Sequence, residues 1–186
     1  MNCYSQQQNG IAIGTTFSKY SGVSEYGWVS GFYFELTTKF KTPYEALIFR
    51  PAIGYSQYGY SQQINSFEFK VKSNKIDLQF DVEYNLNNYL KGLSGVFGIG
   101  FEYLLYSKIK YDVAGIDDYR SPFTLSLNNM GSNMDFGFNY NLGLASLELK
   151  YEFFVLDFNS FRQISNSDFS RRRHLIKIGI LYFIDY

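Results

Sequence analysis

Residues 76–86 read IDLQFDVEYNL, an unbroken alternation of apolar and polar side chains over eleven residues. Successive side chains of a β-strand point to opposite faces, so this pattern predicts a strand with one apolar and one polar face. A strand of about 10–13 residues, tilted by about 40°, is long enough to cross the hydrocarbon layer of a membrane. The stretch therefore predicts a membrane-crossing β-strand.

The same period of two recurs along most of the chain, which has 18 Tyr and 19 Phe but only 3 Pro. Aromatic residues favour strands, and an even number of antiparallel strands can close into a barrel. We predict an all-β protein, an eight-stranded antiparallel up-and-down transmembrane β-barrel with a closed, polar-filled interior. Residues 11–186 are expected to form the barrel and residues 1–10 a polar N-terminal extension. The seven further strands are expected at 11–20, 28–40, 44–58, 95–106, 134–143, 145–156 and 174–186.

The size of the barrel decides which face points inward. An eight-stranded barrel is only just wide enough to be filled by side chains, so it cannot enclose aromatic rings from eight strands. We therefore expect the apolar face to meet lipid and the charged face to pair inside as a polar core, with a proton or ion path as the alternative. The expected interior residues are Glu35, Lys39, Arg50, Asp77, Asp81, Glu83, Glu102, Asp135, Glu148, Lys150, Glu152 and Lys177. Interfacial girdles are expected from Tyr44, Tyr58, Tyr84, Tyr103, Tyr106 and Tyr151.

The connections between the expected strands alternate in length. Residues 59–74, 109–132 and 158–173 read as long loops, whereas 41–43 and 143–145 read as tight turns. Barrels of the outer membrane have short periplasmic turns and longer external loops. The N-terminus is therefore expected in the periplasm.

Composition excludes several classes of protein. The 17 basic and 17 acidic residues balance, so no nucleic-acid surface is expected, and Cys3 is the only cysteine, so no intrachain disulfide can form. The sequence contains no run of about 18 apolar residues, so no transmembrane helix is expected. Residues 1–10 lack the apolar core of a signal peptide, so we expect that a mature outer-membrane chain has lost its signal.

The C-terminal segment ends in an aromatic residue that is in register with the apolar face of the last strand. The pattern matches the signal by which the barrel-assembly machinery recognises its substrates during insertion. The expected assembly signal is Ile178, Ile180, Tyr182, Ile184 and Tyr186.

Four segments carry a resemblance to a known family, namely 76–86, 98–105, 135–143 and 147–151. Through them, residues 10–186 resemble the PorT-like outer-membrane β-barrel proteins. The resemblance implies a barrel in the outer membrane and transfers no catalytic residue.

Candidate chemistry is sparse. His174 is the only histidine and could serve a hydrolase at the rim, but no serine is placed beside it. Asp112, Asp117 and Asp118 match no calcium-loop spacing. Arg171, Arg172 and Arg173 are expected at the outer mouth, in contact with lipid phosphates or simply solvated. No catalytic, cofactor or metal site is expected.

The sequence thus favours a small non-enzymatic barrel of the outer membrane, structural or accessory, alone or as a subunit of a larger envelope complex. Its expected partners are outer-membrane lipids, the assembly machinery and other envelope proteins. The alternatives are a channel or transporter for small solutes and a soluble lipocalin-like binder of lipophilic ligands, whose apolar face would point inward.

Overall fold

The computed structural model describes residues 7–21, 26–42, 46–64, 67–87, 89–113, 116–120, 130–157 and 172–184. These residues form strands and the turns between them. No helix in this part of the chain has the length and hydropathy needed to cross a membrane. Ten strands are described: β1 (Gln7–Ser21), β2 (Tyr26–Gly27), β3 (Val29–Lys41), β4 (Leu47–Ile64), β5 (Phe67–Asn85), β6 (Leu93–Val113), β7 (Ile116–Arg120), β8 (Met130–Asn141), β9 (Ala145–Asp157) and β10 (Arg172–Ile184).

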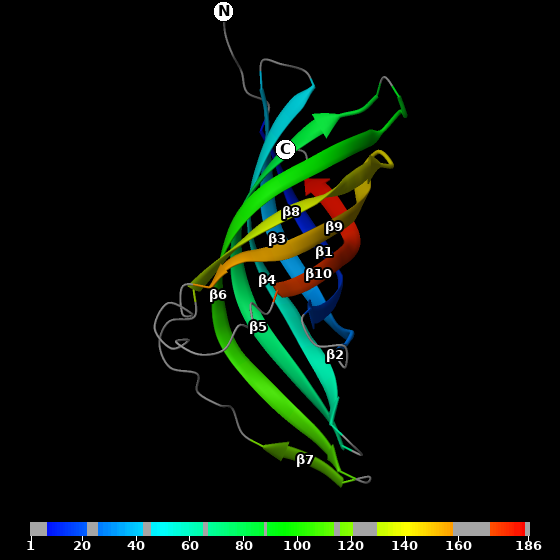
Figure 1. Ribbon diagram of the computed structural model, residues 1–186. Helices are drawn as coiled ribbons and strands as arrows, with labels where there is room; N and C mark the ends of the chain where they lie inside the picture. The colour runs from blue at the N-terminus through cyan, green and yellow to red at the C-terminus, as the bar shows by residue number, and fades with distance from the viewer. Residues whose placement is uncertain are drawn as a thin grey trace, which may run out of the picture.

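Eight of these strands close into a barrel (Figure 1). The order around it is β1, β3, β4, β5, β6, β8, β9 and β10, and β10 pairs with β1 to complete the circle. Every pairing is antiparallel and joins consecutive barrel strands, which is the up-and-down topology predicted from the sequence. The short strands β2 and β7 pair with the edges of β4 and β6.

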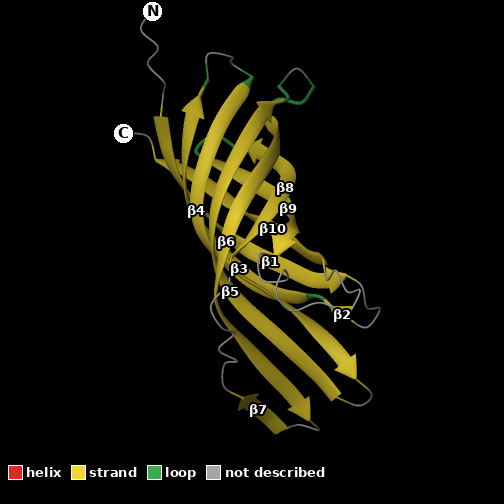
Figure 2. Ribbon diagram, turned by 60° about the vertical axis from the view of Figure 1, so that its left-hand side comes forward, coloured by secondary structure: helices red, strands yellow, loops and turns green. Residues whose placement is uncertain are grey.

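The two ends of the barrel differ. The pairing places Gln7 and Ile184 at the same end as the β5–β6 and β8–β9 turns, and we call this the termini end. At the opposite, or far, end, β4, β5, β6 and β7 extend beyond the other strands as an arm (Figures 1 and 2).

Four strands are longer than the sequence analysis expected. Residues 59–74 were expected to form a loop, and this was wrong, because β4 and β5 stay paired as far as Ile64 and Phe67. Residues 109–132 were also not one loop, since β6 continues to Val113 and pairs with β7. At the start of the chain, β1 begins at Gln7, inside the stretch expected to be a polar extension.

The outer surface of the barrel is apolar on all eight strands. Exposed large side chains form a continuous belt that includes Ile13, Phe34, Ile53, Leu78, Ile99, Phe138, Leu149 and Ile180. The inner face carries the charged residues, so the aromatic face does not line a ligand cavity in the described residues. The soluble lipocalin-like alternative is therefore wrong, and the orientation is that of a transmembrane barrel.

Most of the tyrosines expected in the interfacial girdles lie on the outer surface. Tyr84, Tyr103 and Tyr106 are exposed there. Tyr58 was wrongly placed, because its ring is buried inside the barrel beneath the Arg173 guanidinium, whose carbon lies 4.3 Å from the ring centre. Tyr44 lies outside the described residues.

The apolar belt predicts the effect of a charge on the lipid face. Leu149 is exposed on β9 between outward residues of β8 and β10. We expect Leu149→Arg to lower the free energy of unfolding from lipid vesicles by about 2–4 kcal/mol, because arginine is costly inside the bilayer. Denaturant titration of folding into phosphatidylcholine vesicles measures this change, with Leu149→Met as the control. Equal stability of the two variants would contradict a lipid-facing position.

Candidate functional site

The interior of the barrel is filled by charged side chains. Among the described residues, eight carboxyl groups and five cations are buried there. Buried charges are costly unless they are paired and hydrogen-bonded, so their contacts determine what the interior can do. They are Glu35, Asp77, Asp81, Glu83, Glu102, Asp135, Glu148 and Glu152 with Arg50, Lys75, Lys150, Arg173 and Lys177.

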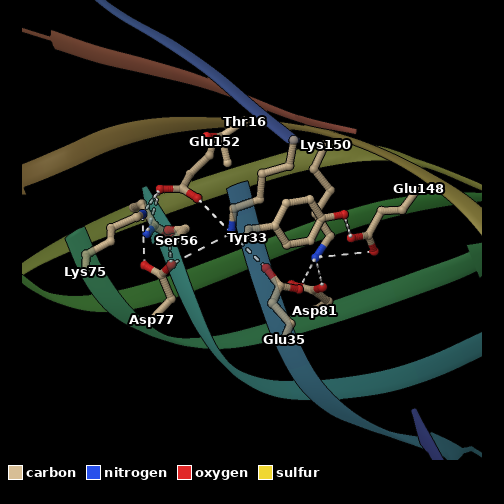
Figure 3. A network of polar contacts seen from close by, with 12 residues as sticks. Thr16, Tyr33, Glu35, Ser56, Lys75, Asp77, Asp81, Glu148, Lys150 and Glu152 are labelled. Carbon is tan, nitrogen blue, oxygen red and sulfur yellow. Dashed lines mark hydrogen bonds and ion pairs between the residues drawn. The ribbon is translucent and has the colours of Figure 1, made fainter. Parts of the chain in front are cut away.

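The part of the network nearer the termini end is organised by Arg50 of β4. Its Nη2 donates to Asp81 Oδ2 of β5 and to Glu148 Oε2 of β9, both at 2.7 Å. The strands β4 and β9 face each other across the barrel, so the Arg50–Glu148 bond crosses the lumen. Lys150 Nζ reaches the same Asp81 oxygen at 2.7 Å. One aspartate is thus held by two cations from different walls. Figure 3 shows the contact between Lys150 and Asp81.

A second centre lies nearer the far end, around Lys75 of β5. Its ammonium contacts Asp77 Oδ1 at 2.8 Å and Glu102 Oε2 at 2.9 Å, and it also bonds Glu152. The oxygens of these three carboxylates lie within 4.8 Å of one another, which is the arrangement that a divalent cation would need. The ammonium already occupies their common centre, so these residues hold Lys75 in place of a metal ion.

Lys177 of β10 joins the two centres. Its Nζ lies 2.8 Å from Glu35 Oε1 and 3.3 Å from Glu152 Oε2. Glu35 also faces Lys150 at 3.7 Å, so charge pairing runs without a break along the barrel axis. Figure 3 shows Glu35, Lys150 and Glu152 of this network pointing into the lumen.

Tyr33 of β3 fills the middle of the lumen with an uncharged ring. Its hydroxyl donates to Glu148 Oε1 at 3.2 Å. The ring lies against Gly14 of β1 and Gly179 of β10, where an added β-carbon would collide with it. These two glycines are therefore required by the close approach of the ring to the wall.

One buried carboxyl group has no counterion among the described residues. Neither oxygen of Asp135 on β8 has a hydrogen-bond partner. Across Gly98 it faces Asp81, and both carboxyl groups reach the point where a β-carbon of Gly98 would lie. Two carboxyl groups are thus brought together, and of the two only Asp81 forms ion pairs with described residues.

The structure brings together the interior residues chosen from the sequence. Glu35, Arg50, Asp77, Asp81, Glu102, Asp135, Glu148 and Lys150 are all buried within the barrel. Sequence reasoning missed Lys75, which it assigned next to an expected loop, and the buried amides Gln79, Asn133 and Asn139. Lys75 stands two residues before Asp77, in phase with the polar positions of 76–86, and this is the signal that could have placed it inside.

The prediction for Arg173 was wrong. Its guanidinium is buried and donates to both oxygens of Glu102, with the Nη1 bond at 2.8 Å, and to Glu152 Oε1 at 3.1 Å. It therefore cannot reach a lipid phosphate. The alternation of β10 explains this, because Arg173 shares the inward face with Lys177. Arg171 and the side chain of Arg172 lie outside the described residues.

The remaining candidates are placed as follows. His174 lies on the outward face of β10, where its Nδ1 forms a hydrogen bond with the Tyr151 hydroxyl, and no rim site forms around it in the described residues. Asp112, Asp117 and Asp118 lie on β6 and β7, and their side chains are outside the described part. Of the expected assembly signal, Ile178, Ile180 and Tyr182 face outward, Ile184 is half-buried, and Tyr186 lies outside the described residues.

Comparison with solved structures supports the fold. The chain is similar to Neisserial surface protein A at 15% identity with a TM-score of 0.52, over 94% of this chain and 96% of that one. It is similar to Ail, the attachment invasion locus protein of Yersinia pestis, at 15% identity with a TM-score of 0.50, over 96% and 99% of the two chains. No protein-family model and no curated protein matches the sequence.

Removal of one cation from the Lys75 centre is expected to destabilise the barrel strongly. Lys75→Met leaves three carboxylates close together, and breaking a buried ion pair costs about 3–5 kcal/mol. Urea unfolding of the refolded protein in detergent micelles measures the loss. The control is Lys70→Met, an exposed lysine on the arm, for which a change within about 0.5 kcal/mol is expected. A loss at Lys75 no larger than the control would show that the network contributes nothing.

Removal of the unpaired acid is expected to have the opposite effect. Asp135→Asn keeps the shape of the side chain but ends the repulsion by Asp81, so the free energy of unfolding in micelles should stay the same or rise. The matched variant Asp81→Asn should lose stability, because Asp81 pairs with Arg50 and Lys150. A loss of more than about 1 kcal/mol for Asp135→Asn would mean that Asp135 has a stabilising partner.

Proposed function

We propose that the chain is a small integral protein of a bacterial outer membrane, with a structural or accessory role and no catalytic activity. The observation that carries the proposal is the interior network, in which ion pairs join opposite walls and close the lumen. The apolar belt supports a membrane location, and the fold shared with solved bacterial barrels favours the outer membrane.

The proposed partners follow from the surface of the barrel. Lipids of the outer membrane would cover the belt, and the barrel-assembly machinery would recognise the outward residues of β10 as the protein inserts. A further envelope protein would join it if it serves as a subunit of a larger complex. The resemblance to the PorT-like family agrees with this proposal.

The test combines two measurements on the refolded full chain. The unboiled protein should require detergent and migrate differently from the boiled protein on a denaturing gel. In planar bilayers it should show no stable conductance in salt, because the paired side chains exclude a continuous water path. Steady single-channel conductance of the native chain would instead support a channel for small solutes.

A double variant tests whether the network closes the lumen. Glu102 on β6 and Arg173 on β10 pair across the lumen. The double substitution Glu102→Ala and Arg173→Ala shortens both side chains, and we expect measurable ion leakage if it still folds by the gel test. No leakage from the folded variant would assign closure to the remaining side chains.

A further inference from the structure

A polar cavity opens at the termini end of the barrel. Its volume is about 570 Å³, and it lies between the β5–β6 turn, the β8–β9 turn and the adjoining strand ends. The ion pairs of the network lie deeper in the barrel. Glu83 belongs both to the cavity lining and to the network, where it pairs with Arg50. Its polar lining includes Asn85, Asn87, Lys91, Asn139, Asn141 and Ser146.

Three asparagines of this lining have fixed orientations. The Asn87 backbone N–H donates to Asn85 Oδ1 at 3.0 Å, that of Gly92 to Asn87 Oδ1 at 2.8 Å, and that of Gly143 to Asn141 Oδ1 at 2.7 Å. Because only the oxygen of an amide accepts a backbone N–H, each Nδ2 group must point the other way. None of the three Nδ2 groups has a partner among the described residues, so each of these lining residues keeps an unused donor.

The charge at the cavity is positive. Lys39 and Glu83 pair at 2.9 Å and compensate each other. Lys91 is exposed and forms no ion pair with any described residue. Among the described lining residues, one ammonium is therefore left without a counterion.

A buried amide also belongs to the lining. Asn139 is 3% exposed, and its Nδ2 donates to Glu83 Oε1 at 2.7 Å. Its Oδ1 is buried and has no hydrogen-bond partner among the described residues. Because this oxygen is out of reach of solvent, recognition of a ligand in the cavity rests on the donors of Lys91 and of the turn asparagines.

We propose that this cavity binds a carboxylate-bearing ligand. The Lys91 ammonium and the amide donors of Asn85, Asn87 and Asn141 would bind the carboxylate. One ammonium balances the single charge of a carboxylate, whereas a phosphate dianion would keep an unbalanced charge. An acidic saccharide and the C-terminus of a peptide both offer this chemistry.

Calorimetric titration of the refolded full chain in micelles tests the proposal with four probes. Glucuronate and N-acetyl-alanylalanine carry the carboxylate, and glucose and the C-terminal amide of the same dipeptide lack it. We expect at least one acid to bind about tenfold or more tightly than its uncharged counterpart. Binding of glucuronate alone identifies a saccharide ligand and binding of the peptide acid alone a peptide ligand, while both together support general carboxylate recognition. Equal binding within both pairs, or no binding at all, overturns the proposal.

Variants that keep the turns intact separate the site from the fold. Asn87→Asp and Asn141→Asp retain the oxygen that caps each turn but replace the donor with a negative charge, and Lys91→Gln removes the ammonium. Each should weaken binding about tenfold or more without changing gel migration. Lys70→Gln, on the arm at the far end, should bind as the native chain does. Native-like binding by all three cavity variants would place the ligand elsewhere. Calorimetric titration in micelles measures binding whether or not the barrel conducts ions. Its result is therefore independent of the conductance measurement.

Discussion

The pairing of buried charges across a narrow lumen is the constraint on which the rest of this barrel depends. Eight strands enclose a space that side chains alone can fill, so a charge on one wall is always close to the opposite wall. Arg50 and Glu148 meet at 2.7 Å from facing strands, and Lys75 gathers three carboxylates. A charged interior of this width is stable only as a paired network, and a paired network closes the lumen.

The same constraint fixes the register of the strands. In β9, Lys150 points into the network and its neighbour Leu149 points into the apolar belt. A shift of one residue in pairing would exchange every such pair, placing charges in lipid and leucines among ions. The belt and the network therefore stabilise the same register, although they never touch. A strand with an acidic face, such as β5, therefore has one favoured register in the wall.

The sequence was sufficient for the fold because period-two alternation is local. The stretch 76–86 shows by itself that one face is apolar and the other acidic, and barrel size then decides which face is inside. The site was harder to predict, because partners come from distant strands. Arg173 lies 71 residues from Glu102 in the chain, and no local pattern links them. Lys75 was missed for a different reason: the polar residues around it resembled a loop, while pairing with β4 keeps them in a strand.

Pairing inside the barrel also determines where recognition can occur. Apart from Asp135, the charged groups in the middle of the lumen are paired with one another, so few of them are available to a ligand. At the termini end, the asparagines use one atom to hold a turn and keep the other for the cavity. Asn141 Oδ1, for example, accepts from the backbone N–H of Gly143, whose φ of +108° lies in the range that favours glycine. The requirement that orders the turn thus also orients the donor, and a rigid cavity with unused donors arises from turn formation alone. Recognition at this end of the barrel therefore needs no residue from the network that holds the barrel closed.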